Sequence, residues 1–284
     1  MSNPIAIITG ANGGMGREIT KKVVSAGYTT IMACRSAKDA TPVFQQIQKE
    51  TGGELILMEL DLASFDSIKR FVDEYRQRFS RISLLINNAG ILCHHPEVTE
   101  ENIERTVGVN YLGHFILSHQ LFPFIERGGR VLNMVSLTYK YGKIDEQLFR
   151  PIDAAKFNRF SAYSNSKLAF LYFTLDAAEA WKDKEITVNC ADPGIVSTKI
   201  IRMGNKMIDE LCDIFFRPFI KKPIEGASTL LHLALSDQVK QVRGQCFANK
   251  KRVKISQKIL QNPQRTKLRE MTGALLKEHF TIHY

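Results

Sequence analysis

The sequence predicts an α/β fold in which a doubly wound parallel sheet carries helices on both faces. Short apolar runs such as residues 5–8 are typical of strands that are buried on both faces of a parallel sheet. These runs alternate with amphipathic stretches, and that order favours right-handed strand–helix–strand crossovers. The chain has 284 residues, of which 44% are hydrophobic, and it shows no repeat or linker. We therefore expect one domain over residues 1–284.

The elements follow from local patterns along the chain. Residues 5–8 predict the first strand, a glycine-rich turn follows, and residues 16–26 predict an amphipathic helix that ends at Gly27. Further strands are expected over 28–33, 55–60, 82–86, 130–135 and 186–190. Further helices are expected over 41–50, 64–79, 112–125 and 162–181. Residues 142–160 and 199–223 break the alternation, and the latter predict a lid-like insertion beside a ligand.

Charge and cysteine content restrict the class of protein. The net charge is +10, and much of the excess lies in a basic C-terminal segment, residues 249–284, which we interpret as solvated. No aromatic interleaving or nucleic-acid motif accompanies it, so nucleic acid is not an expected partner. Five scattered cysteines without a C-x-x-C pair favour a reducing compartment over a disulfide framework or zinc ribbon. Without a signal-peptide pattern or an apolar run of about 20 residues, the sequence predicts a cytoplasmic protein with no transmembrane segment.

A glycine-rich turn, T-G-A-N-G-G-M-G at residues 9–16, lies between the first strand and the first helix. Glycines allow a tight turn and close approach of the backbone to a bulky anion. The free N–H groups and the dipole at a helix N-terminus then favour a pyrophosphate. The residues expected to bind a dinucleotide here are Gly10, Asn12, Gly13, Gly14, Met15 and Gly16.

Tyr163 and Lys167 are the expected proton-transfer pair. They lie four residues apart, so on a helix they share one face. A free tyrosine has a pKa of about 10, which makes it a poor base near neutrality. A neighbouring ammonium favours the phenolate, and we expect it to lower the pKa of Tyr163.

The glycine turn and six further motifs in order resemble those of the short-chain dehydrogenase/reductase family, whose Rossmann-like fold matches the predicted sheet. The turn spacing is T-G-x-x-x-G-x-G, and Y-x-x-x-K spans Tyr163 to Lys167. The other matching positions are Asp61 and Leu62, the N-N-A-G run with Asn88, Ala89 and Gly90, Asn110 in V-N-Y-L-G-H-F, Ser136, and P-G-x-V-x-T with Pro193, Gly194, Val196 and Thr198.

The resemblance implies a role for each matching position. Asn110, Ser136, Tyr163 and Lys167 would be catalytic, with the serine holding the substrate oxygen and the lysine also bonding the nicotinamide ribose. Asn110 would interrupt its helix and hold a water that leads toward Lys167. The implied cofactor-binding residues are Asp61, Leu62, Asn88, Ala89, Gly90, Tyr163, Lys167, Pro193, Gly194, Val196 and Thr198.

Cofactor choice depends on the end of the second strand. No acidic residue stands at Cys34 or Arg35 to accept the adenosine ribose hydroxyl of NAD(H). Arg35 can instead pair with a 2′-phosphate, and Arg17 is positioned to add to the positive field. The sequence therefore predicts NADP(H) over NAD(H). No metal is expected, because the histidines lack ligand spacing.

Within the family, the chain resembles the retinol dehydrogenase-like branch through the A-C-R run at residues 33–35, V-N-Y-L-G-H-F, and the long stretch between Ser136 and Tyr163. It departs from that branch at Val135 and Asp192, where a second serine and a histidine are frequent. The resemblance implies a small-molecule carbonyl or alcohol substrate, with a hydrophobic one favoured. It also implies a homodimer or homotetramer, unless the C-terminal segment covers the associating helices.

Three other functions share parts of this pattern. A sugar-nucleotide epimerase or dehydratase shares the fold and Y-x-x-x-K, but the glycine spacing and the short portion after Pro193 disfavour it. A non-catalytic dinucleotide-sensing regulator would keep the glycine turn and be expected to lose Tyr163 or Lys167. A membrane-surface or nucleic-acid binder that uses the basic segment would show salt-dependent binding that does not require Tyr163.

Overall fold

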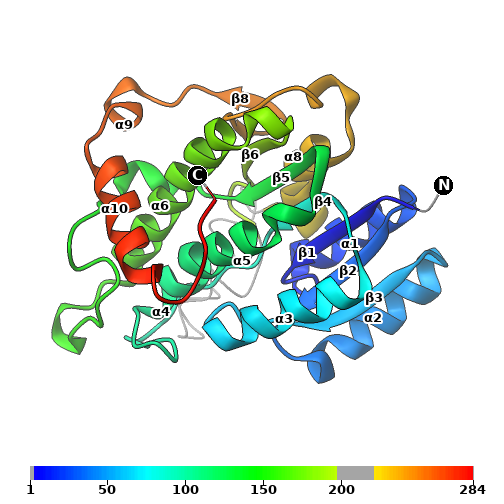
Figure 1. Ribbon diagram of the computed structural model, residues 1–284, viewed down its shortest axis with the longest axis horizontal. Helices are drawn as coiled ribbons and strands as arrows, with labels where there is room; N and C mark the ends of the chain where they lie inside the picture. Colours follow the sequence, from blue (N-terminus) through cyan, green and yellow to red (C-terminus); the bar gives the residue numbers. More distant parts are fainter. Residues whose placement is uncertain (1–2, 197–220, 284) are drawn as a thin grey trace.

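The strands of the computed structural model pair in one sheet whose order is β3-β2-β1-β4-β5-β6-β7-β8 (Figure 1). The structure describes residues 3–196 and 221–283. The strands are β1 (Ile5–Thr9), β2 (Thr29–Cys34), β3 (Leu55–Glu59), β4 (Ile82–Asn87), β5 (Ile125–Met134), β6 (Thr187–Asp192), β7 (Cys246–Ala248) and β8 (Lys251–Val253). Neighbours pair in parallel from β3 to β7, and β8 pairs antiparallel with β7. The predicted doubly wound parallel sheet is confirmed.

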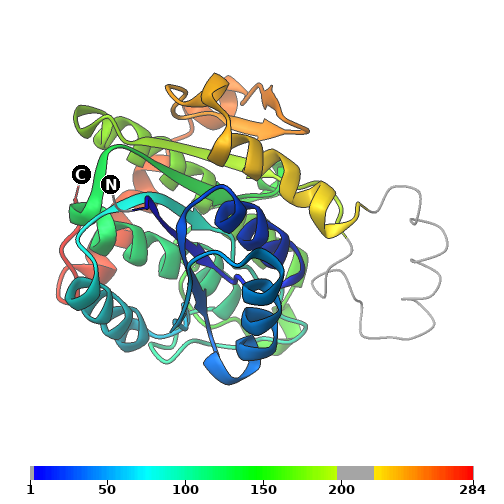
Figure 2. The same ribbon diagram turned by 90° about the vertical axis from the view of Figure 1, so that its right-hand side faces the viewer.

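Helices cover both faces of the sheet (Figure 2). One face carries α1 (Gly14–Ser25), α2 (Ala37–Thr51) and α8 (Pro223–Leu235). The other carries α3 (Phe65–Arg78), α4 (Arg105–Val107), α5 (His114–Leu121), α6 (Arg159–Ala180), and α10 (Gln264–Leu276) outside α6. Shorter helical pieces are a π-helical turn η1 (Gly108–Gly113), 3₁₀ turns η2 (Phe122–Phe124), η3 (Leu137–Tyr141), η4 (Ala154–Lys156), η5 (Lys182–Lys184) and η8 (Asp237–Val239), and α9 (Gln257–Leu260).

The first strand shows why the apolar runs fold this way. Every residue of β1 is buried. Side chains alternate across a strand, so Ile5 and Ile7 pack into the core beneath α3, α5 and α6, whereas Ala6 and Ile8 pack beneath α1, α2 and α8. A strand that is apolar on both faces therefore requires helices on both sides.

Several element boundaries differ from the sequence expectation. Helix α2 begins at Ala37, earlier than expected, because the Ser36 hydroxyl accepts the Asp39 N–H at 3.1 Å and caps the helix. The helix expected over 112–125 already begins as α4 and passes through the π-helical turn η1. Strand β5 ends at Met134, so Ser136 lies two residues beyond the strand instead of closing it.

The prediction of a solvated C-terminal segment is wrong for much of its length. Lys250 and Lys251 are exposed in the β7–β8 hairpin, but Leu268, Leu276 and Phe280 are buried. Those apolar side chains join the core on the α6 side of the sheet. The expected lid-like insertion lies almost wholly outside the described residues. Among the helices that the structure describes, none has the length and apolarity needed to cross a membrane.

Candidate active site

The glycine turn after β1 folds tightly against the start of α1. Gly10 has a positive φ of 61°, which favours glycine, and a Cβ at Gly16 would lie only 2.1 Å from the Gly10 carbonyl oxygen. Gly13 precedes the helix without a side-chain cap, Gly14 begins it, and the first turn of α1 contains no acidic residue. The N–H groups of that turn are therefore suited to an anionic ligand.

The buried thiol of Cys34, at the end of β2, lies next to the backbone of this turn. Desolvation by burial raises the pKa of the thiol to about 11, although the nearby backbone of Asn12 and Ala11 opposes that shift. Cys34 therefore stays protonated at neutral pH, and its sulfur helps to place the Asn12 backbone.

Two arginines lie near the same edge of the sheet. Arg35 follows β2 directly and is exposed. Arg17 is in the first turns of α1, where Nη2 lies 3.7 Å from Glu50 Oε1. Its Nε is buried and has no hydrogen-bond partner among the described residues. The two arginines expected to favour a 2′-phosphate thus lie at the carboxyl end of β2 and in the first turns of α1.

A buried hydrogen-bond chain joins the glycine turn to the loop after β4. The hydroxyl oxygen of Thr9 accepts the N–H groups of Asn88 and Ala89 at 2.9 and 3.0 Å. His114 Nε2 lies 2.9 Å from the same oxygen, and His114 Nδ1 faces the Asn110 carbonyl at 3.4 Å. Burial, followed by the charge of Lys167, lowers the pKa of His114 to about 3, so its ring is neutral.

The sequence assigns neither His114 nor Thr9 a role in the site beyond their places in V-N-Y-L-G-H-F and the glycine-rich turn. The signal for Thr9 was its position at the carboxyl end of a buried strand, where a hydroxyl can reach the neighbouring strand. His114 has no comparable signal, because its partner is distant in sequence.

Asp61 and Leu62 form the turn after β3. The Asp61 carboxylate accepts the Ala63 N–H at 2.9 Å, and the Asp61 N–H bonds Ser67 Oγ at 2.9 Å. Leu62 is buried against the π-helical turn, where a Cβ at Gly113 would lie 2.4 Å from the Leu62 carbonyl oxygen. This close approach places η1 against the edge of the sheet.

Asn110 lies within η1, so the expected interruption of its helix is seen as a π-helical turn. Its Oδ1 accepts the Ile91 N–H at 2.8 Å, and its Nδ2 donates to Ile91 O at 2.9 Å and to Ser166 Oγ at 3.1 Å. A Cβ at Gly90 would lie 3.5 Å from Asn110 Oδ1 and 3.7 Å from Lys167 Nζ. The loop after β4 therefore adjoins both catalytic candidates.

Ser136, Tyr163 and Lys167 lie together where β5 ends beside α6. Ser136 lies next to the Tyr163 hydroxyl, and its side chain opposes the rise in the pKa of Tyr163. Buried Lys167 donates to the Met134 carbonyl oxygen at 2.8 Å, and its Nζ lies 5.4 Å from the centre of the Tyr163 ring. Because of desolvation, the pKa of Lys167 falls to about 8, although the charge of Asp192 opposes that shift.

The expected lowering of the Tyr163 pKa is not found. Burial and then the Asp192 charge raise the pKa of Tyr163 to about 12, against the opposing effect of the Ser136 side chain. The physical reason is that the environment desolvates the phenolate, and the ammonium of Lys167 hydrogen-bonds the Met134 carbonyl.

The turn after β6 meets the glycine turn at α8. Gly194 has a positive φ of 76°. A Cβ at Gly226, in the first turn of α8, would lie 2.5 Å from the Val196 side chain and 3.0 Å from Met15 Sδ. The side chains of Val196 and Met15 therefore both lie against α8 at Gly226, at a distance that only a glycine allows. Thr198 lies outside the described residues.

Comparisons with known proteins agree with this arrangement. The family model described as short chain dehydrogenase matches residues 4–150 and 151–209. Retinol dehydrogenase 14 of Mus musculus is 33% identical over 97% of this chain and 86% of its own length. Retinol dehydrogenase 12 of Homo sapiens is 31% identical over 96% and 86%.

A crystal structure of an uncharacterized protein from Mycobacterium paratuberculosis matches 99% of this chain and 96% of its own, with a TM-score of 0.77 and 26% identity. The fold, the ordered motifs and the curated relatives all agree. The chain belongs to the short-chain dehydrogenase/reductase family, in its retinol dehydrogenase-like branch.

Proposed function

We propose that the protein is an NADP(H)-dependent oxidoreductase that transfers hydride between the nicotinamide and a hydrophobic carbonyl/alcohol pair, with Tyr163 as the general acid/base. Membership of the family supports oxidoreductase activity on CH–OH and C=O groups. The observation that carries the finer proposal is the grouping of Ser136 and Tyr163 beside the buried ammonium of Lys167, where β5 ends next to α6.

The residues around the glycine turn suit a dinucleotide. A Cβ at Gly16 would fill the space against Gly10, and the uncapped start of α1 offers N–H groups to a pyrophosphate. Arg35 and Arg17 would face a 2′-phosphate, and Gly90 leaves room beside Lys167 for the nicotinamide end. When bound, the nicotinamide supplies or accepts the hydride.

The protein's own residues would manage the proton. A phenol with a pKa near 12 stays protonated at neutral pH, so Tyr163 would donate its proton to the oxygen on which negative charge develops during carbonyl reduction. The Ser136 hydroxyl would hold that same oxygen. Lys167 would orient the phenol and contact the ribose, and Asn110 would hold the loop at Ile91 in place.

Exposed apolar side chains near these residues support a hydrophobic substrate. Tyr141, Phe160 and Ile195 are 83%, 56% and 51% exposed. They belong respectively to the turn after Ser136, the first turn of α6 and the turn after β6. The names of the curated relatives, which include retinol, agree with this substrate class.

A substrate panel tests the activity. Retinoids, steroids, aliphatic aldehydes, quinones and small keto compounds would be assayed by NADPH absorbance, with Tyr163→Phe alongside. We expect turnover of at least one hydrophobic compound and a loss of about 10²- to 10⁴-fold in Tyr163→Phe, because the proton donor is removed. Equal turnover by that variant and the parent would remove Tyr163 from its role.

Cofactor choice is tested by initial rates with NADPH and NADH. We expect Arg35→Ala to reduce the NADPH preference about tenfold or more, because it removes a charge-assisted hydrogen bond. Arg76→Ala, which removes an exposed arginine on α3, is the matched control and should leave the preference unchanged. A preference for NADH that survives Arg35→Ala would contradict the assignment.

A further inference from the structure

Asp192, the last residue of β6, is a carboxylate buried at the junction of two site turns. Its side chain is 6% exposed. One carboxylate oxygen accepts the Leu137 N–H at 2.9 Å, and the other accepts the Gly194 N–H at 3.1 Å. Leu137 directly follows Ser136, and Gly194 belongs to the turn after β6. One side chain therefore connects the catalytic serine to the turn expected beside the nicotinamide.

The charge of Asp192 faces groups on each element packed around it. These groups are Tyr163 and Lys167 on α6, Tyr139 on η3, Lys221 before α8, and Cys190 on β6 itself.

The ammonium groups of Lys221 and Lys167 compensate the charge of Asp192 to different extents. The Lys221 ammonium also donates to Pro193 O at 3.0 Å and to Asn249 Oδ1 at 2.7 Å, so it is held at the rim of the turn. Lys167 has Met134 O as its hydrogen-bond acceptor. Asp192 is thus the carboxylate that opposes the cost of burying the Lys167 ammonium.

A buried charge is not needed to make these two turns. A serine hydroxyl or an asparagine amide can also accept an N–H at the end of a strand, without the desolvation cost of a carboxylate. Burial indeed raises the pKa of Asp192, although two backbone N–H groups and two lysines oppose that shift. A carboxylate that is buried despite this desolvation cost indicates a functional role in the site.

We propose that Asp192 is a positioning residue of the active site. Its two oxygens hold the turns at Ser136 and Gly194 in one arrangement, and its negative charge, which faces Tyr163 and Lys167, offsets part of the cost of burying the Lys167 ammonium. The inference rests on the oxidoreductase function proposed above. It also gives a role to one of the two residues at which the sequence departs from its branch.

The charge of Asp192 determines the direction in which the pH profile of the reaction should shift when that charge is removed. A negative charge near a phenol raises its pKa, and near an amine it also raises the pKa, so removing the Asp192 charge lowers both. In Asp192→Asn, we expect the alkaline limb of the kcat/KM profile for carbonyl reduction to move about one unit toward lower pH. The KM for the dinucleotide should rise several-fold, because the amide cannot accept both N–H groups.

Three further variants make the test specific. Asp192→Ser also removes the charge and guards against poor folding of Asp192→Asn, and it should give the same shift. Asp192→Glu keeps the charge and should keep the alkaline limb of the parent. Asp176 lies more than three turns after Tyr163 on α6 and pairs with Arg265 of α10. Asp176→Asn removes that carboxylate and should leave the pH profile unchanged. Melting curves identify the variants that fold.

An unshifted alkaline limb in folded, uncharged variants would overturn the proposal while leaving the oxidoreductase function intact. Ultraviolet titration of tyrosinate, taken as the difference between each protein and its Tyr163→Phe counterpart, reports the charge effect without substrate. If the parent turns over no compound with either dinucleotide, the proposed function fails, yet this titration still decides the role of Asp192. An unchanged Tyr163 titration in Asp192→Asn and Asp192→Ser would reject that role.

Discussion

Lys167 illustrates how a single residue of the proposed active site can oppose the stability of the fold. Its ammonium is buried, and the loss of water lowers the pKa from 10.5 to about 8. That shift corresponds to a cost of about 3 kcal/mol for keeping the charged form in the folded protein. The same burial places Nζ beside Tyr163 and the backbone of the loop after β4. Burial therefore lowers the stability of the folded protein while it holds the Lys167 ammonium in place, and such a trade-off is common at functional sites.

This cost predicts a pH window. Between pH 8 and 10.5 the unfolded chain binds the Lys167 proton more tightly than the folded chain, so the free energy of unfolding rises with pH there. We expect the parent to gain up to about 3 kcal/mol relative to Lys167→Met across that window. Urea denaturation of both proteins at a series of pH values measures the difference. A constant difference would mean that the lysine is not desolvated.

Gly16 gives a second prediction at this scale. An added Cβ would lie 2.1 Å from the Gly10 carbonyl oxygen, so the backbone of the turn must move. We expect Gly16→Ala to weaken dinucleotide binding at least tenfold in a fluorescence titration, because the cradle for the pyrophosphate opens. Gly273→Ala on α10, where an added Cβ meets nothing within 4 Å, is the control. That control should bind normally and gain up to about 1 kcal/mol of stability.

At the scale of elements, the start of α6 matters because it carries Tyr163 in its second turn. The Asn158 side chain accepts the N–H groups of Phe160 and Ser161, both at 3.0 Å, and so caps the helix. We expect Asn158→Ala to cost about 1 kcal/mol and to lower kcat, because fraying of the first turn loosens Tyr163. Ser64→Ala removes the cap of α3, and it should lower the melting temperature while sparing kcat. Equal kcat values in Asn158→Ala and Ser64→Ala would contradict the link between the cap of α6 and the position of Tyr163.

The sequence predicts elements well where the signal is local. The apolar runs of β1 and β2 and the glycine turn follow from neighbours in the chain, and the order of motifs places Ser136 and Tyr163 at the same edge of the sheet. The π-helical turn at Asn110 was anticipated only as an interruption, because its geometry depends on packing against Leu62. The raised pKa of Tyr163 depends on burial and on Asp192, which lies far away in sequence, so no local pattern indicates it.

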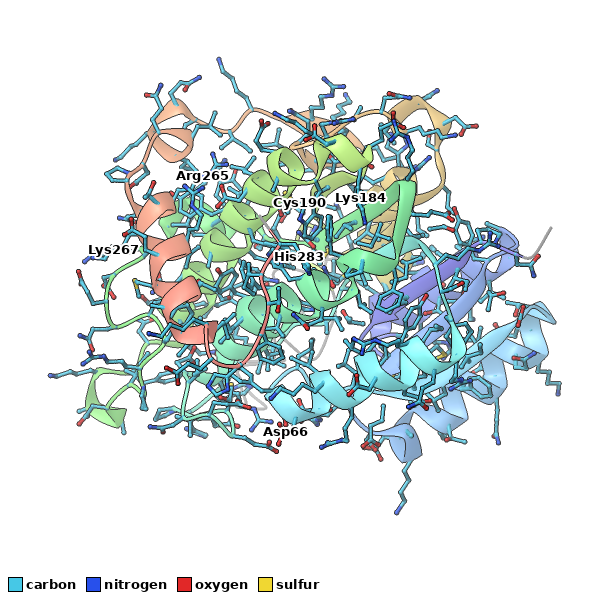
Figure 3. All side chains as sticks on the ribbon, viewed as in Figure 1. Asp66, Lys184, Cys190, Arg265, Lys267 and His283 are labelled. Carbon is cyan, nitrogen blue, oxygen red and sulfur yellow. The ribbon has the colours of Figure 1, made fainter. Side chains whose placement is uncertain are left out.

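At the scale of the whole molecule, the C-terminal segment lies across α5 and α6 (Figures 1 and 3). Tyr111 bonds Thr272 across this contact at 2.8 Å, and Arg265 on α10 pairs with Asp176 on α6 at 2.7 Å. The Trp181 indole donates to the carbonyl of residue 283 at 3.1 Å. A cavity of about 10 Å³ between the layers barely admits one water, so the packing is close.

From the sequence, this cover is only an exception to the expected self-association, because the apolar positions of the segment match a face that exists only after α5 and α6 have folded. Family resemblance led us to expect self-association through the helices that bear Asn110 and Tyr163. The segment occupies the outer faces of α5 and α6, so we predict that the full chain does not associate there and scatters light as a 32.2 kDa monomer at micromolar concentration.

Phe280 offers the means to test this. It is 9% exposed and packs edge-on against Phe65, with ring centres 5.3 Å apart. Phe280→Ala should cost about 3 kcal/mol, because a large apolar side chain is lost from the core. It should also loosen the end of the segment and raise the apparent mass in light scattering as the apolar helix faces become exposed. Lys277→Ala, an exposed position on the same segment, should remain a monomer. A parent protein that scatters as a dimer, with a mass unaltered by Phe280→Ala, would place self-association on a different surface from α5 and α6.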